Sequence, residues 1–98
     1  MRIVNFKEFV ELPSGTIFSY YEPDVYVGLF RKEDTIYDSW ENSKSKEAID
    51  YFQVSLLPQT DFNQEFFGLK ERWGEFSWEQ QYAIYEESDL QILRKLIG

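Results

Sequence analysis

This chain of 98 residues contains no cysteine, so neither disulfide bonds nor thiolate-bound metal ions can hold it together. A domain of this size buries about 60–68% of the surface that its unfolded chain exposes, and it must draw its stability from apolar side chains. Hydrophobic residues make up 43% of the sequence, which is enough for one core. We therefore expect a single compact domain over residues 1–98, and the lack of cysteine suits the cytoplasm.

Histidine is also absent, which removes the side chain most often used for acid–base catalysis near neutral pH. Serine triads and histidine-ligated zinc are excluded with it. The five glycines are scattered and form neither of the phosphate-binding patterns GxGxxG and GxxxxGK, so no nucleotide cofactor is expected. We expect a protein that is not an enzyme and has no cofactor. A small enzyme that uses two facing carboxylates is the alternative.

The charge balance points to the kind of partner. Eighteen acidic residues against ten basic residues give a net charge of -8. Such a charge repels nucleic-acid phosphates and favours a basic protein partner, so direct nucleic-acid binding is not expected. No apolar run approaches the ~20 residues of a membrane span, and Met1 to Val10 mixes charged with apolar residues, unlike a signal peptide. We expect a cytoplasmic protein with no membrane partner.

The first part of the chain reads as a short helix followed by three strands. Asn5 and Glu8 have capping-box spacing, and Pro13 cannot continue a helix, so we expect a helix over Asn5 to Leu12. β-branched and aromatic residues predict the strands that follow. Their expected ranges are Thr16 to Tyr21, Val25 to Arg31 and Thr35 to Trp40, with a charged turn at Lys32 to Asp34.

The clearest strand is expected at Ile49 to Leu57, after a polar segment at Glu41 to Glu47 that reads as a solvated loop. In this strand Phe52, Val54 and Leu56 alternate with more polar residues. Because successive side chains of a strand point to opposite faces, the even-numbered residues are expected to face the core.

Residues 58–79 have no sustained hydrophobic period, although they are rich in aromatic residues. A stretch of this length without regular structure is unusual in a compact domain. We therefore expect a short helix near Asp61 to Phe67 and a turn near Lys70. Gln81 to Tyr85 then reads as the last strand.

A C-terminal helix is expected to begin at Ser88, with Gln91 at the capping-box position. Its charges complement the helix dipole, with Glu86, Glu87 and Asp89 at the start and Arg94 and Lys95 at the end. Together these elements predict an α+β fold. It has about five mostly antiparallel, curved strands, flanked by a short N-terminal helix and a C-terminal helix.

Three segments carry a resemblance to a known group of proteins. Phe9 to Pro23 contains the pattern F-x-x-L-P-x-G-T followed by Y-E-P, and it resembles the opening of small uncharacterised accessory proteins of tailed phages and prophages. Asp50 to Leu56 and Tyr82 to Leu90 are similar to an aromatic strand and a closing strand of the same group. The resemblance implies a small accessory protein that acts inside an infected bacterial cell, and it implies no catalytic residues.

The strongest candidate for a binding surface is the segment Asp61 to Asp89. It contains eight aromatic residues and eight acids against two bases, so it carries six of the eight net negative charges. Acids among aromatics offer a basic groove both charge complementarity and apolar anchors. The alternative is that the aromatics form the core and the acids keep the surface soluble. The expected binding residues are Asp61, Glu65, Glu71, Trp73, Glu75, Phe76, Trp78 and Glu79.

These features suggest a phage-encoded inhibitor without catalytic activity. It would bind a nucleic-acid-binding bacterial defence complex, preferably an RNA-guided CRISPR effector, whose positively charged channel holds nucleic acid. One alternative is an immunity or antitoxin-like protein that covers the basic active site of a nuclease toxin. Another is a structural or assembly component of the phage.

Overall fold

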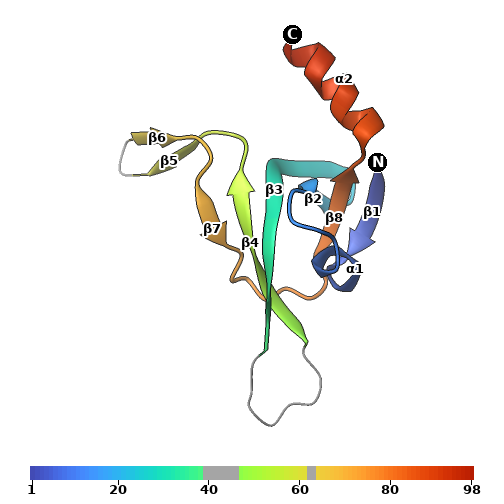
Figure 1. Ribbon diagram of the computed structural model, residues 1–98, viewed down its shortest axis with the longest axis vertical. Helices are drawn as coiled ribbons and strands as arrows, with labels where there is room; N and C mark the ends of the chain where they lie inside the picture. The colour runs from blue at the N-terminus through green and yellow to red at the C-terminus, as the bar shows by residue number, and fades with distance from the viewer. Residues whose placement is uncertain (39–46, 62–63) are drawn as a thin grey trace.

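The computed structural model describes residues 1–38, 47–61 and 64–98, with the backbone alone described for residues 59–61 and 64–66. Within these residues the fold is α+β, and an open, curved, antiparallel sheet of six strands carries two helices (Figure 1). The strand order is β1-β8-β2-β3-β4-β7, and β5 and β6 form a separate hairpin. The elements are β1 (Arg2–Asn5), α1 (Phe6–Val10), β2 (Ile17–Glu22), β3 (Val25–Tyr37), β4 (Ala48–Ser55), β5 (Gln59–Asp61), β6 (Gln64–Phe66), β7 (Lys70–Arg72), β8 (Gln81–Tyr85) and α2 (Glu87–Ile97).

The predicted N-terminal cap is confirmed, although the helix is shorter and a strand precedes it. The Asn5 side chain accepts the backbone N–H of Glu8 at 2.9 Å, and the Glu8 carboxylate accepts the N–H of Asn5 at 3.4 Å. Helix α1 ends at Val10, two residues before the predicted end at Leu12. Strand β1 escaped prediction because Val4 alone of its four residues is buried, which leaves no alternation to detect.

Strands β2 and β8 lie where strands were predicted, and they pair with each other in the middle of the sheet. Their register places Phe18 opposite Ile84 and Tyr20 opposite Tyr82. β8 also pairs with β1, and β2 also pairs with β3. Both strands therefore have a neighbour on each side, which explains why their β-branched and aromatic sequences were easy to recognise.

Strand β3 continues for 13 residues, so the predicted turn at Lys32 to Asp34 is wrong. An irregularity between Lys32 and Thr35 interrupts its pairing with β4. Lys32 is 1% exposed, and burial lowers its pKa. Its ammonium group donates to the Glu33 carbonyl at 3.1 Å and to the Thr35 hydroxyl at 2.8 Å, and lies 5.9 Å from the centre of the Phe9 ring. The sequence alone does not distinguish a buried lysine whose ammonium group is hydrogen-bonded in this way from a lysine on the surface.

Strand β4 lies where predicted, but its expected core face is only partly correct. Val54 is buried, whereas Leu56 is exposed and follows the strand. On the opposite face Tyr51 is 0% exposed and Gln53 is 7% exposed. These polar residues point inward because their side chains hydrogen-bond there, and hydrophobicity alone does not reveal such partners.

The described residues near Asp61 to Phe67 belong to strands β5 and β6 instead of the predicted helix. β5 and β6 pair antiparallel, with Gln59 opposite Phe66, and the hairpin stands beside the main sheet (Figure 1). The predicted turn near Lys70 is also wrong, because Lys70 begins β7 and pairs with Val54. The pairing of β7 with β4 joins residues distant in sequence, so local propensity does not specify it. The loop expected at Glu41 to Glu47 lies outside the described residues except for its last residue.

Helix α2 is confirmed, although it begins earlier than predicted. Its N-cap is Glu86 instead of Ser88, and the Glu86 N–H donates to the Asp89 carboxylate at 2.8 Å. The N-terminal ammonium of Met1 lies 2.7 Å from the same carboxylate, and this hydrogen bond lowers the pKa of Asp89. Among the described residues, no helix is both long enough and apolar enough to cross a membrane.

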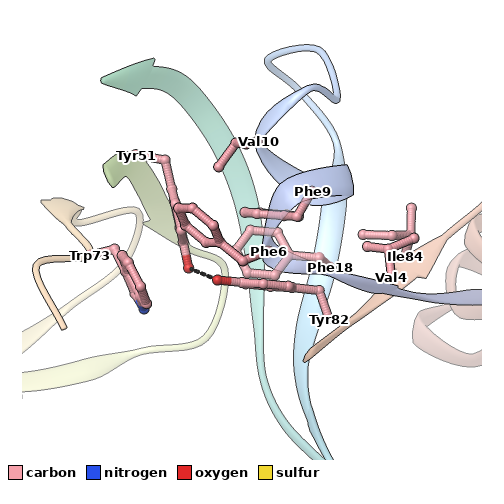
Figure 2. Packing of buried hydrophobic residues seen from close by; sticks show 9 residues of the cluster. All are labelled: Val4, Phe6, Phe9, Val10, Phe18, Tyr51, Trp73, Tyr82 and Ile84. Carbon is pink, nitrogen blue, oxygen red and sulfur yellow. Dashed lines mark hydrogen bonds between the residues drawn. The ribbon is translucent and has the colours of Figure 1, made fainter. Parts of the chain in front are cut away.

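The core consists mainly of aromatic rings that α1 presses against the curved sheet. The Phe9 ring stacks on Tyr82 with 3.9 Å between centroids, and it meets Phe18 and Tyr51 edge-on at 4.6 and 4.8 Å (Figure 2). Such pairs contribute about 0.5–1.5 kcal/mol each beyond the burial of their surface. The buried cluster comprises Val4, Phe6, Phe9, Val10, Phe18, Tyr51, Trp73, Tyr82 and Ile84.

Three tyrosine hydroxyls meet inside this aromatic core. The Tyr51 hydroxyl donates to that of Tyr82 at 3.1 Å (Figure 2). It also lies 3.1 Å from the Tyr20 hydroxyl, which donates to Gln53. Burial raises the pKa of Tyr20 to about 12, and it also raises the pKa values of Tyr51 and Tyr82. The folded state therefore favours the neutral phenols.

We predict that alkali unfolds this protein by ionising its buried tyrosines. Because the pKa of Tyr20 is about 12 when folded and 10.0 ordinarily, its contribution is complete below pH 10.0 and is lost as the pH rises towards 12. The free energy of unfolding in urea should fall by about 1.4 kcal/mol per pH unit for each such tyrosine. The lowered pKa of Lys32 acts in the opposite direction, but only below its ordinary value of 10.5.

Two tyrosine variants separate buried from exposed hydroxyls in this experiment. Tyr20→Phe should make the alkaline fall shallower, whereas Tyr26→Phe, at a residue that is 50% exposed, should leave it unchanged. Identical slopes for both variants and the original chain would contradict the assignment.

Candidate protein-binding surface

The segment between β7 and β8 divides the predicted binding residues into one buried residue and several exposed ones. Trp73 is 6% exposed and belongs to the core, whereas Phe76 is 45% and Trp78 is 53% exposed. Glu75 and Glu79 are also exposed. Trp73 therefore fits the core interpretation, while Phe76 and Trp78 have the exposure that the binding interpretation requires. We call Glu75, Phe76, Trp78 and Glu79 the 75–79 surface.

A buried carboxylate ties the start of this segment to strand β4. Asp50 is 0% exposed, and its Oδ1 accepts the N–H of Tyr51 at 2.8 Å and of Gly74 at 3.0 Å. Its Oδ2 accepts a hydrogen bond from the guanidinium of Arg72. The N–H of Trp73 in turn donates to the Tyr51 carbonyl at 3.0 Å. The chain is therefore held on both sides of Trp73, and the surface that follows it starts from a fixed position.

Aromatic contacts continue from the core to the exposed rings. Trp73 stacks on Tyr51 at 5.2 Å and on Phe6 at 5.3 Å between centroids. Trp78 lies 4.9 Å from Phe6 and 5.8 Å from Phe76. The indole Nε1–H of Trp73 is buried and has no hydrogen-bond acceptor among the described residues, so ring contacts dominate the packing of this side chain. The exposed rings are thus supported from beneath by buried ones.

Phe76 adopts a backbone conformation that bulky residues rarely use. Its φ angle is 52°, in the left-handed region, where a side chain costs about 1–2 kcal/mol. Gly74, at φ 66°, occupies the same region without this cost. The Phe76 ring lies 6.1 Å from Trp73 and 5.8 Å from Trp78, and these contacts offset part of the strain. Retained strain of this kind is a recurrent feature of functional segments.

The charges of this region are distributed unequally between interior and surface. Arg72 is engaged with the buried Asp50, so its positive charge is balanced from within the fold. Glu75 and Glu79 face solvent, while Glu71 in β7 is only partly exposed. The charge that a partner meets beside Phe76 and Trp78 is therefore negative.

Two predicted binding residues lie elsewhere. Asp61 is in β5 and Glu65 is in β6, where they pair with Gln64 and Thr60. The hairpin adjoins the end of β7 opposite to the 75–79 surface (Figure 1). The structure therefore does not bring these two acids together with Glu75 and Glu79.

Two residues from outside the segment also contribute to this region and were not predicted from the sequence. Phe6 supports Trp78, and Glu22 shares an open depression of about 230 Å³ with Glu79. An enzyme that uses two carboxylates requires two acids in one depression, as here, but Glu22 and Glu79 are both exposed. The rest of the lining consists of Tyr21, Pro23 and three uncharged polar residues. No local sequence signal connects Phe6 or Glu22 with a segment more than fifty residues away.

Comparisons with protein-family models, with curated proteins and with solved structures found no match to this chain. Among the described residues, no group of three or more acidic side chains is placed to hold a metal ion. The geometry of the 75–79 surface is therefore the basis for assigning a function.

We predict that Asp50→Ala destabilises the protein by about 3–5 kcal/mol, because it leaves two backbone N–H groups and a guanidinium without their common buried acceptor. Urea unfolding followed by tryptophan fluorescence measures this, since Trp73 and Trp78 lie beside the affected segment. Asp34→Ala, which removes an exposed acid, should change stability by about 0.5 kcal/mol or less. Equal stability of the two variants would refute the anchoring role of Asp50.

We predict that Phe76→Gly is more stable than Phe76→Ala by about 1 kcal/mol, because glycine accepts the left-handed backbone without strain. Both variants lose the same ring contacts, so the difference in their free energies of unfolding reports the backbone. At Lys7, an exposed residue of α1, the order should reverse, because glycine weakens a helix relative to alanine. The same order at both positions would rule out backbone strain at Phe76.

Proposed function

We propose that this protein is a non-catalytic inhibitor that binds a basic protein through the 75–79 surface. The observation that carries the proposal is the pair of half-exposed rings, Phe76 and Trp78, in mutual contact between two exposed carboxylates. Large aromatic residues exposed together are uncommon on surfaces that bind nothing. Their position between Glu75 and Glu79 supports a cationic partner.

The two kinds of side chain contribute differently to such a complex. Phe76 and Trp78 supply apolar area that loses water on binding, and aromatic anchors of this type dominate the energy of many interfaces. Glu75 and Glu79 increase the rate of encounter with a positive surface and select against negative ones. The complex is therefore expected to be tight and to weaken as salt rises.

The attachment of the surface to the core lowers the cost of binding. Asp50 and the buried Trp73 hold the chain that leads into Phe76, so little backbone freedom remains to be lost. Interfaces that are ordered before contact keep more of their interaction energy as affinity. This supports a binding role for a segment that has no regular secondary structure.

The preferred partner is an RNA-guided bacterial defence effector, which holds nucleic acid in a positively charged channel. An acidic surface with exposed rings can occupy such a channel in place of DNA. The resemblance of Phe9 to Pro23 to phage accessory proteins supports this setting, in which the inhibitor acts in the cytoplasm of an infected bacterial cell. A basic nuclease toxin offers similar chemistry and is the second candidate.

The experiment is a competition assay with purified effector complexes and, in a parallel arm, with basic nuclease toxins. The chain should displace target DNA from an effector, and Trp78→Ala should weaken this about 30-fold. Glu75→Lys combined with Glu79→Lys should weaken it about ten-fold at low salt and less at high salt. Glu11→Lys, a charge reversal at an exposed residue outside the surface, should have little effect.

Each arm has a decisive result. Unchanged DNA binding at saturating inhibitor rejects competition with the effector, and toxin neutralisation in its place identifies the second candidate. If binding occurs but Trp78→Ala and Glu11→Lys behave alike, the 75–79 surface is not the interface.

A further inference from the structure

Helix α2 has an apolar face that the rest of the described chain covers only in part, since Leu90 and Leu93 are half-buried and the apolar residues at its end are exposed. None of its residues is buried, and Leu96 and Ile97 are 77% and 86% exposed. Leu90 and Leu93 precede them at helical spacing, so the four residues share one side of the helix. Figure 1 shows α2 leading away from the sheet, with its last turn far from any strand.

An isolated helix of this length is marginally stable in water, even when well capped. α2 has its cap at Glu86 and favourable charges at both ends, but these contribute only a few tenths of a kcal/mol to about 1 kcal/mol each. Most helices in proteins are stabilised by packing of an amphipathic face. We therefore expect another apolar surface to pack against the exposed face of α2.

The charges along α2 indicate what that occupant is. Glu87 and Arg94 lie on the same side of the helix, since their side chains are joined at 2.8 Å, and Leu90 lies between them. In an antiparallel pair of α2 helices centred near Leu90, Glu87 of each copy lies beside Arg94 of the other. In a parallel pair, Arg94 would instead lie level with the Arg94 and Lys95 of the other copy. The charge pattern thus fits a second α2 in the antiparallel orientation.

The apolar residues fit the same orientation. With the axis near Leu90, the exposed Leu96 and Ile97 at the tip of one helix reach the base of the other. Met1 lies at that base, because its ammonium group contacts Asp89, and it is 49% exposed. Each tip therefore meets an apolar residue of the second copy as well as its helix.

We propose that α2 joins two copies of this chain as an antiparallel, twofold-symmetric pair. Helices about 16 Å long bury less surface than a standard interface, so we expect a dissociation constant on the order of micromolar. The 75–79 surface comes just before β8 in the chain and α2 comes just after it, so the surface and the helix lie at opposite ends of β8 (Figure 1). Pairing through α2 leaves the 75–79 surface uncovered and does not depend on the proposed function.

The first test is sedimentation of the full chain over about 1 to 500 μM. The mass should rise with concentration from 11.8 kDa to twice that value. Leu96→Asp should weaken association at least ten-fold without unfolding the chain, because Leu96 is exposed in the single copy. Gln91→Asp, which adds the same charge on the polar side of α2, is the matched control. A chain that stays monomeric, or a dimer equally sensitive to both variants, overturns the proposal.

The second test determines orientation and uses the absence of native cysteine. Leu90→Cys should form an intermolecular disulfide on oxidation, because the two Leu90 positions adjoin the axis. Leu96→Cys should not, because the two Leu96 positions lie about 16 Å apart along an antiparallel pair, beyond the ~7 Å that a disulfide spans. Arg94→Glu should weaken association, and adding Glu87→Arg should restore it. Cross-linking at both cysteine positions would indicate a parallel pair and overturn the proposal.

Discussion

Tyr51 lies where the sheet, helix α1 and the segment leading to the 75–79 surface meet. Its ring packs against Phe9 and Trp73, its hydroxyl bonds to that of Tyr82, and its carbonyl accepts the N–H of Trp73. Asp50, the preceding residue, holds Gly74. In a chain without disulfides, two adjacent residues of β4 thus connect the core to the candidate surface. A polar residue at the centre of the core is tolerated because its hydroxyl is hydrogen-bonded.

The sequence predicted those parts of the fold that depend on neighbouring residues. The capping box at Asn5, strands β2 and β8 and the C-terminal helix all follow from local spacing. The wrong predictions concern residues whose structure depends on interactions that hydrophobic periodicity does not show. Lys32 to Asp34 looked like a turn because all three residues are charged, but Lys32 is buried and donates to Thr35 across a strand irregularity. The β5–β6 hairpin and β7 likewise depend on strand pairing that no helical or alternating pattern of hydrophobic residues predicts.

The candidate site was predictable in composition but not in arrangement. Acids and aromatics cluster visibly in the sequence after Asp61, yet sequence does not reveal that Trp73 is buried and Trp78 is exposed. The difference arises from Tyr51, which covers one ring, and from Phe6, which supports the other. Asp61 and Glu65 belong to a hairpin at the other end of β7. They are therefore close to Glu75 and Glu79 in sequence but not in space.

The two outermost strands of the sheet are its shortest, with four residues in β1 and three in β7. Free strand edges can recruit strands from other chains and start aggregation, and short, charged edges resist this. β1 carries Arg2, and β7 consists of Lys70, Glu71 and Arg72. The sheet can therefore remain open without growing into a fibre, and contacts with other molecules are left to side chains instead of backbone pairing.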